Sequence, residues 1–307
     1  MTVHHIDPAP ETVTDVFSPS LAPVLSIEPG DSVVVRSLDA AGYLAKQQYP
    51  GEQVGTLIPG RRGHCLTGPI EVRGTDESMT LAVTFESLVP DDWGWTVAAA
   101  LDNHLNRRLG VTNGPPSWLL WSLDVEKGIG TNDRGFSVEL APFLGVVGLP
   151  PKEPGEHSTI PPRTIGGGNI DCRELVAGST LYLPITVPGA MLCLGDGHAA
   201  QGDGEVGGTA IECPMTTTVR LDVVTGRPVS GVHAVTPKGK ITFGFSADLN
   251  EATADALDAM LSWMQVLFNL EKSAALALAS AVVDMRVTQI ANETWGVHAM
   301  LRDGVLL

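Results

Sequence analysis

Acidic and imidazole side chains gather in one glycine-rich segment of this chain, GDGHAAQGDGE at residues 195–205. Asp196 and His198 stand two positions apart after an apolar run, so on a strand both side chains leave the same face. A carboxylate and an imidazole that converge in this way supply half the ligands of a divalent metal such as zinc. The alternative is an Asp–His hydrogen bond that closes a hairpin. The Asp-Gly pair before Glu205 is a turn signal that returns this acid towards the same corner.

Two glutamates compete for the role of general base beside such a metal. If residues 190–198 and 205–213 pair as a simple hairpin, Glu205 lies near the imidazole. Glu212 then lies roughly 13–20 Å away, at ~3.3 Å per residue. Proton transfer requires hydrogen-bond contact, which favours Glu205. A wide loop would bring Glu212 back into consideration.

Other polar residues follow short apolar runs and are further candidates for the same site. Asp39 follows the run 32–38 and is either a metal ligand or a turn residue. Asn169 and Asp171 stand two apart after three glycines. They either orient substrate and ligands or form an Asx turn. Gln201, inside the glycine-rich segment, is a candidate substrate-binding residue.

A longer stretch, GDGHAAQGDGEVGGTAIE at residues 195–212, resembles the signature of the acetamidase/formamidase family. Similar landmarks flank it, and the resemblance spans roughly residues 20 to 300. These landmarks are EPGD at 28–31, TGPI at 67–70, PPR at 161–163, GGNID at 167–171, GSTLYLP at 178–184 and PGA at 188–190. The chain departs from the family pattern at Cys65, in place of proline, and at Gly207, in place of a frequent cysteine. Residues 100–140 have no clear counterpart, which leaves the choice of substrate open.

The resemblance implies metal-dependent hydrolysis of a small linear amide, such as formamide or acetamide, to a carboxylate and ammonia. It implies that the chain forms a homo-oligomer, and it makes His64 a further metal ligand, unless His64 is simply a loop histidine beside two arginines. Oxygen and nitrogen ligands together favour zinc and also admit calcium or manganese. Two alternatives stay open: hydrolysis of a cyclic amide such as a γ-lactam, and a non-catalytic relative that only binds a small molecule.

Charge and cysteine content limit the partners and the compartment. The formal charge is 19 − 35 = −16, which argues against nucleic acid and anionic membranes and favours a small neutral substrate. No secretory signal is recognisable, and the longest apolar run, residues 274–283, is shorter than the ~20 residues of a membrane span. Four cysteines without paired spacing predict reduced, mostly buried thiols in a cytoplasmic protein.

The elements that must position these residues are mainly strands. Period-two apolar spacing, punctuated by glycine and proline, predicts a β-sandwich or jelly-roll-like body with strands at 32–38, 81–85, 219–223 and 241–245. Between residues 89 and 170 the periodicity fades, which predicts loops that cover an active site.

The pattern changes after residue 246. Apolar residues at helical spacing predict a helix from residue 249 to 268. Asn269 is a candidate N-cap for a second, deeply packed helix at 270–284. Strands at 288–290 and 296–301 complete the pattern. We therefore expect a mainly β fold with a catalytic body at 1–235 and a smaller C-terminal α+β part at 236–307.

Overall fold

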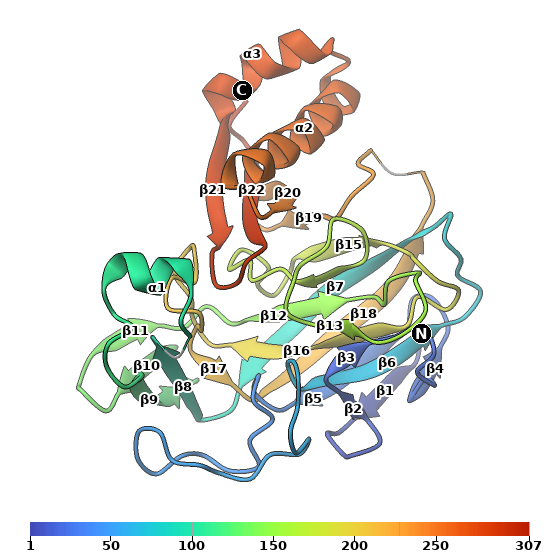
Figure 1. Ribbon diagram of the computed structural model, residues 1–307. Helices are drawn as coiled ribbons and strands as arrows, with labels where there is room; N and C mark the ends of the chain where they lie inside the picture. The colour runs from blue at the N-terminus through green and yellow to red at the C-terminus, as the bar shows by residue number, and fades with distance from the viewer. Residues whose placement is uncertain (100, 227, 307) are drawn as a thin grey trace.

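The computed structural model describes residues 1–99, 101–226 and 228–306, and strands dominate it (Figure 1). Nine of the described strands form one sheet, in which neighbouring strands are antiparallel except for β1 and β5. In spatial order these strands are β1 (Val3–Ile6), β5 (Ser32–Ser37), β18 (Met215–Val224), β7 (Thr80–Pro90), β15 (Thr180–Pro184), β19 (His233–Thr236), β20 (Gly239–Ser246), β22 (Trp295–Arg302) and β21 (Val283–Gln289).

A second sheet contains eleven of the described strands, and β16 is its branch point. One part of β16 pairs with β6, its end pairs with β17, and its other edge pairs with β12. The main path is β11 (Ser137–Glu139), β10 (Ile129–Asn132), β9 (Ser117–Asp124), β8 (Trp93–Ala98), β17 (Glu212–Cys213), β16 (Leu192–His198), β12 (Phe143–Gly148) and β14 (Gly167–Asn169). Beside it lie β6 (Leu66–Val72), β2 (Val13–Thr14) and β4 (Leu25–Ile27), and the short strands β3 (Val16–Phe17) and β13 (His157–Ser158) pair separately.

One hydrophobic core joins the two sheets. It contains Val83 and Leu181 from the nine-stranded sheet and Ile70, Leu144 and Leu194 from the other, each fully buried. Burial alternates along β18, as expected for a strand with one face against a core. The mainly β fold with a C-terminal α+β part is therefore confirmed, and the four strands expected from period-two spacing lie within or next to β5, β7, β18 and β20.

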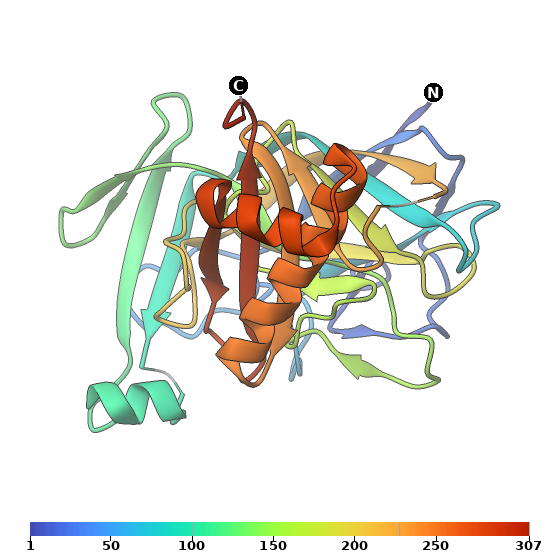
Figure 2. The ribbon, with the colours of Figure 1, turned by 90° about the horizontal axis from the view of Figure 1, so that it is seen from above.

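The C-terminal helices lie over the end of the nine-stranded sheet that contains β20, β22 and β21 (Figures 1 and 2). Helix α2 (Leu249–Phe268) begins at Asp248, whose side chain accepts a hydrogen bond from the backbone N–H of Asn250. Its buried residues recur at helical spacing and pack with residues of α3 (Lys272–Val282) and β22. None of the described helices is long and apolar enough to cross a membrane.

Two expectations about the C-terminal part are wrong. Asn269 ends α2 in the left-handed conformation, with φ 52° and ψ 49°, and Glu271 is the N-cap of α3. Helix α3 is also not deeply packed, because Ala275 and Ala279 are its buried residues and Leu276 is 45% exposed. The last two strands were expected correctly, although β21 begins earlier than predicted. The division after residue 235 stays a prediction, and it falls within β19.

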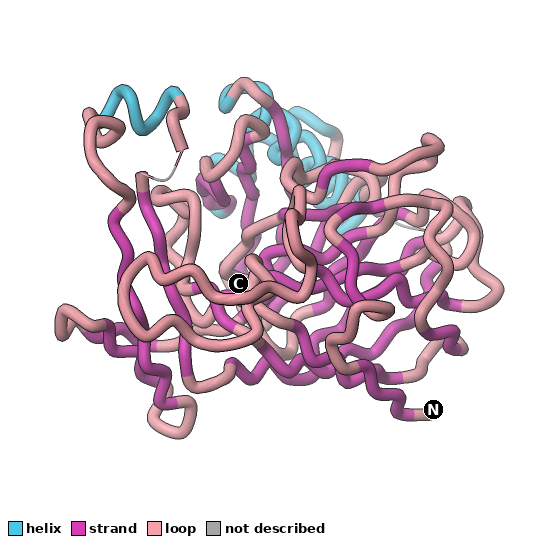
Figure 3. The backbone as a smooth tube through the Cα atoms, turned by 60° about the horizontal axis from the view of Figure 1, so that its bottom comes forward, coloured by secondary structure: helices cyan, strands magenta, loops and turns pink. Residues whose placement is uncertain are grey.

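The expectation of loops between residues 89 and 170 is also wrong. This region contains β8 to β14 and the short helix α1 (His104–Leu109). Strands β9 to β11 stand at the side of the body in Figure 2, and α1 lies apart from the other two helices in Figure 3. Strand β11 is exposed along its whole length. It therefore has no buried apolar face, and the alternation of apolar and polar residues that identifies a strand is not present in its sequence.

Candidate functional site

Strand β16 delivers Asp196 and His198 to one buried place. The strand is buried along its whole length and ends at His198. Nε2 of His198 lies 3.4 Å from Oδ1 of Asp196, so the predicted convergence of these two side chains is confirmed. Gly145 on the neighbouring β12 leaves the space they occupy. A Cβ there would lie 2.7 Å from Oδ1 of Asp171 and 2.8 Å from Cε1 of His198, and it would also meet Oδ2 of Asp196.

Glu212 faces the same imidazole, which corrects the simple-hairpin expectation. His198 and Glu212 are direct partners in the β16–β17 register, and Oε1 of Glu212 lies 3.3 Å from Nε2 of His198. Thirteen residues connect His198 to Glu212, and this connection is longer than the turn of a simple hairpin. It also carries Glu205, whose Oε1 lies 4.0 Å from the same nitrogen. Both glutamates therefore reach the imidazole.

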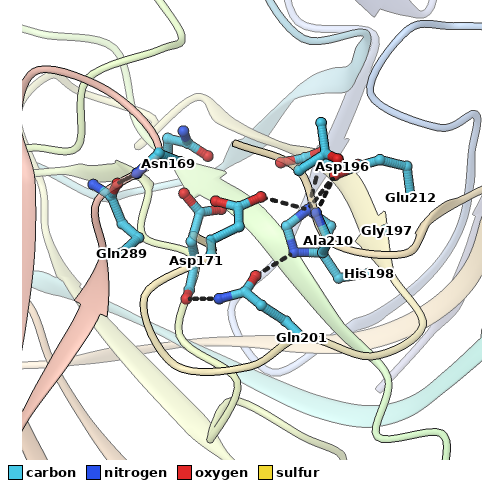
Figure 4. Close-up of polar contacts among 12 residues, drawn as sticks. Asn169, Asp171, Asp196, Gly197, His198, Gln201, Ala210, Glu212 and Gln289 are labelled. Carbon is cyan, nitrogen blue, oxygen red and sulfur yellow. Dashed lines mark hydrogen bonds and ion pairs between the residues drawn. The ribbon is translucent and has the colours of Figure 1, made fainter. Parts of the chain in front are cut away.

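Asp171 joins this cluster from the segment that follows β14. It is 1% exposed and has a left-handed backbone with φ 52°. One atom each from Asp171, Asp196 and His198 lie within 4.8 Å of one another, and the same holds for His198, Glu205 and Glu212. Figure 4 shows the side chains of Asp171, Asp196 and Glu212 turned towards the His198 ring. We call these five residues, Asp171, Asp196, His198, Glu205 and Glu212, the central cluster.

Gln201 connects two members of the central cluster. Its Nε2 donates to the backbone oxygen of Asp171 at 2.8 Å, so its Oε1 faces the imidazole and accepts from Nδ1 of His198 at 2.9 Å. The other imidazole nitrogen, Nε2, therefore faces the carboxylates (Figure 4). Both ends of the Gln201 amide are engaged within the protein.

Burial shifts the pKa values of the carboxyl groups in the central cluster. Burial raises the pKa of Asp171 and of Glu205 well above their ordinary values. The charge of Asp171 raises the pKa of Glu205 further, and the charges of Asp196 and Glu212 raise that of Asp171. Burial also raises the pKa of Glu212 to about 7, against the opposing charge of His198. Burial acts in the same direction on Asp196, but His198 and His64 outweigh it and lower the pKa of that acid.

The imidazole of His198 balances part of this charge. Burial alone would lower its pKa, but Glu212 and Asp196 outweigh burial and hold the pKa well above its ordinary value. Four carboxyl groups around one imidazole still leave an excess of potential negative charge. Such a cluster requires protons or a cation to be stable when buried.

Polar atoms without partners test whether a cation fits here. Among the described residues, buried atoms that lack a hydrogen-bond partner include both carboxylate oxygens of Asp171, Oδ1 of Asp196, Nε2 of His198 and Oε2 of Glu212. Buried polar groups normally have partners, so a concentration of orphaned donor atoms in one place is unusual. Carboxylate oxygens and an imidazole nitrogen are suitable ligands for a divalent ion. The residues present therefore fit a divalent metal.

The structure places the two remaining ligand candidates differently. Nε2 of His64 lies 4.0 Å from Oδ2 of Asp196, and its Nδ1 contacts the hydroxyl of Thr159 at 2.9 Å. Asp39 lies outside both metal-ligand groups. Its Oδ1 accepts from the backbone N–H of Tyr43 at 3.2 Å, in the turn arrangement that the sequence left open. Burial raises the pKa of Asp39 to about 6.

A cavity of about 990 Å³ reaches the central cluster. Asn169 lines it and is 5% exposed. Its Nδ2 donates to the backbone oxygen of Ile160 at 3.1 Å, and its Oδ1 has no partner among the described residues. The four acids of the central cluster form the inner wall together with two neighbours, so that this wall consists of His64, Asn169, Asp171, Asp196, Glu205 and Glu212.

The outer walls of this cavity were missed by the sequence reasoning. One wall consists of residues 101–105 and Arg107 around the start of α1, and the other of residues 290–295 between β21 and β22. Both segments are far from the glycine-rich segment in sequence. The only available signal was the general expectation that the region around residues 100–140 helps to cover the site.

Comparisons with known proteins agree with the signature. A model of the acetamidase/formamidase family matches residues 152–294. A putative formamidase of Schizosaccharomyces pombe is 26% identical over 250 residues, which cover 65% of this chain and 61% of that relative. The matched region thus spans less than two thirds of the length of that relative.

Solved structures extend the comparison to the whole fold. The crystal structure of an acetamidase from Yersinia enterocolitica superposes with a TM-score of 0.86 at 26% identity, covering 99% of this chain and 93% of that one. A γ-lactamase from Delftia acidovorans has a TM-score of 0.66 at 18% identity, covering 98% of this chain and 92% of that one, and this likeness shows the fold alone.

Proposed function

The resemblance to the acetamidase/formamidase family is confirmed, and from this relationship we propose that the chain hydrolyses small linear amides, such as formamide and acetamide, to a carboxylate and ammonia. The observation that best supports the proposal is the central cluster, buried at the inner wall of a cavity of about 990 Å³. Its four acids line this cavity, and the His198 imidazole lies behind them against Glu212.

We propose a divalent ion as the cofactor, with zinc first and calcium or manganese as alternatives. Asp196, His198 and Asp171 are the proposed ligands, with His64 beside them. When bound, such an ion supplies a Lewis acid that polarises a carbonyl group and lowers the pKa of water from 15.7 to about 7 in the best cases.

The remaining acids of the cluster are proposed to move protons. Glu212 is held by the backbone N–H of Ala210, which donates to its Oε1 at 2.9 Å. Glu205 lines the cavity from the connection between β16 and β17 and is the proposed general base. It takes a proton from water as the water oxygen bonds to the carbonyl carbon. It then returns the proton to the nitrogen as the carbon–nitrogen bond breaks.

Substrate orientation is proposed to depend on Asn169. Because its Nδ2 is engaged by Ile160, its Oδ1 is free among the described residues to accept a hydrogen bond from the N–H of an amide. Gln201 is proposed to orient His198 and Asp171. Homo-oligomer formation and a cytoplasmic location stay predictions, and size-exclusion chromatography with light scattering tests the former.

Ammonia release tests the proposed activity. The purified chain is loaded in turn with zinc, manganese or calcium, then assayed on formamide, acetamide, butyramide and a γ-lactam, before and after treatment with a chelator. We expect turnover of at least one linear amide, loss on chelation and recovery when the metal is restored. Preference for the lactam would favour the cyclic-amide alternative. No turnover of any amide by metal-loaded protein would favour the non-catalytic alternative.

Glutamate variants separate the two candidate bases. Glu205→Gln keeps the shape of the side chain but cannot take a proton, so turnover should fall by roughly 10²–10⁴-fold, the usual effect of a general acid–base group. Metal content should stay close to that of the parent. The matched variant is Glu212→Gln, and a larger loss there with intact Glu205→Gln activity would transfer the role to Glu212.

A further inference from the structure

Arg286 on β21 contacts two acids that lie next to central-cluster residues in the sequence. Its Nη1 lies 2.5 Å from Oε1 of Glu174, and its Nε donates to Oδ2 of Asp203 at 2.7 Å. Glu174 follows Asp171 by three residues, and Asp203 precedes Glu205 by two. One guanidinium group therefore joins the two chain segments that supply these cluster acids.

Backbone hydrogen bonds hold one of these segments on the same strand. The N–H of Gly204 donates to the oxygen of Thr288 at 3.0 Å, and the N–H of Ile290 donates to the oxygen of Gly204 at 2.8 Å. The loop thereby extends the edge of β21 beside Arg286. Glu205, the next residue, has φ 43°, a left-handed conformation that is unfavourable for a residue with a Cβ. Such a conformation persists only where surrounding contacts hold it.

The ion network around Arg286 is centred on a buried acid, while its other members are partly exposed, Asp203 to 28% and Lys238 to 64%. The side chain of Glu174 is 3% exposed and that of Arg286 is 26% exposed. Nζ of Lys238 contacts the other oxygen of Glu174 at 2.9 Å. A planar guanidinium can bind two carboxylates in defined directions, which a single apolar side chain cannot do.

We propose that Arg286 is a positioning residue that holds the Asp171 and Glu205 segments at the geometry required for amide hydrolysis. The inference rests on the function proposed above. It assigns to β21, in the C-terminal part, a role in ordering acids supplied by the body. Arg286 is not among the residues that line the cavity, so it acts through Glu174 and Asp203.

Three variants test this role. Arg286→Met removes both the charge and the planar guanidinium group that binds two carboxylates, and Arg286→Lys keeps the charge alone. Arg302→Met is the matched control on neighbouring β22, because Nε of Arg302 donates to Asp284 at 2.8 Å in an exposed ion pair. For each we measure kcat and KM for the best amide, the thermal midpoint, and hydrogen exchange of the peptide covering residues 202–206. The kinetic constants are measured at a temperature well below the thermal midpoint of each variant.

For Arg286→Met we expect kcat to fall by about 10- to 100-fold, the effect of misplacing catalytic groups by about 1 Å. KM should change by less than about threefold, exchange at 202–206 should increase, and Arg286→Lys should recover part of kcat. Arg302→Met should match the parent in kcat and exchange. A fall in kcat that only follows the unfolded fraction, or parent-like kcat and exchange in Arg286→Met, would overturn the proposal.

The exchange measurement keeps this proposal separate from the proposed function. If the parent protein hydrolyses no amide, the proposed function fails on its own. The positioning of the 202–206 segment is then decided by exchange alone: faster exchange in Arg286→Met than in Arg302→Met supports it, and equal exchange overturns it.

Discussion

The imidazole of His198 has its two nitrogens directed at different neighbours. Nδ1 faces Gln201 and Nε2 faces the carboxylates of Asp196 and Glu212. The direction of the Gln201 amide is set by its second hydrogen bond, to the backbone oxygen of Asp171. Gln201 thus determines which imidazole nitrogen is available to a metal, a common arrangement around histidine ligands.

Replacing Gln201 should therefore weaken metal binding. In Gln201→Leu, the partner of Nδ1 is lost, and we expect metal affinity to fall by about 10- to 100-fold, the usual effect of removing a residue that orients a ligand. Competition with a chromophoric chelator measures the affinity without reference to turnover. The exposed Gln53→Leu is the control. Equal affinities for both variants would remove Gln201 from this role.

At the scale of single residues, the sequence predicted the side-chain placements that depend on local periodicity. Asp196 and His198 converge on one side of β16, as side chains two positions apart on a strand do, although the backbone of Asp196 is left-handed with φ 59°. Glu212 could not be placed, because its distance from His198 depends on how the connection from 199 to 211 turns. Asp171 was assigned to substrate, and its place in a metal-ligand group follows from the pairing of β12 with β14, a contact between distant segments.

One strand beside the site leaves the space in which the side chains of the cluster come together. On β12, the position opposite the cluster is Gly145, and any side chain there would enter the space of Asp171, Asp196 and His198. The glycine is therefore required by close approach. This requirement links the choice of residue in one strand to the chemistry of its neighbours.

Gly145→Ala should disable the site while the fold persists. The added methyl group would displace Asp171 and His198, which lie less than 3 Å from its position. We expect kcat to fall by at least about 100-fold and metal affinity to decrease with it. Gly130→Ala on β10 is the control, because its Cβ would meet the tips of Leu123 and Leu140 at 3.1 Å and the ring of Trp121 at an ordinary 3.7 Å. Parent-like turnover in Gly145→Ala would mean that the cluster adapts to the methyl group.

The elements were predicted where one face is buried against a continuous core. Helix α2 was recognisable because its buried residues recur at helical spacing. Asn269 was misread because an N-cap and a left-handed C-cap favour the same residue type. Strands β9 to β11 were missed because none of them shows apolar alternation: β9 has consecutive apolar residues at 118–121, the buried positions of β10 are Gly130 and Asn132, and β11 is exposed throughout.

At the scale of the whole molecule, the C-terminal part and the body share one sheet. Strands β19, β20, β22 and β21 continue the sheet from β15, and the segment between β21 and β22 lines the cavity. The candidate site and the packing of the C-terminal part are therefore physically connected. No local pattern could reveal this, because it arises from the order of strands that are far apart in the chain.

Stability of the whole fold should depend on pH through a histidine in this shared sheet. His298 on β22 is fully buried, and its Nδ1 contacts the hydroxyl of Thr288 at 2.8 Å. Burial lowers its pKa to about 4, whereas in the unfolded chain a histidine has a pKa of about 6.5. Between these values the unfolded state binds more protons, so the free energy of unfolding decreases as the pH falls from about 6.5 to about 4.

The size of this effect follows from the two pKa values. A separation of about 2.5 pH units corresponds to a loss of about 3 kcal/mol in the free energy of unfolding. This loss is absent above pH 6.5 and complete near pH 4. His298→Gln removes the titrating group, so the stability of the parent relative to this variant should decrease by about that amount over the same range. Urea denaturation at several pH values measures the difference and cancels the acids common to both proteins. His5→Gln, at an exposed position of β1, must not reproduce this trend. A constant difference between the parent and His298→Gln from pH 7 to pH 4 would show that His298 is protonated equally in the folded and unfolded states.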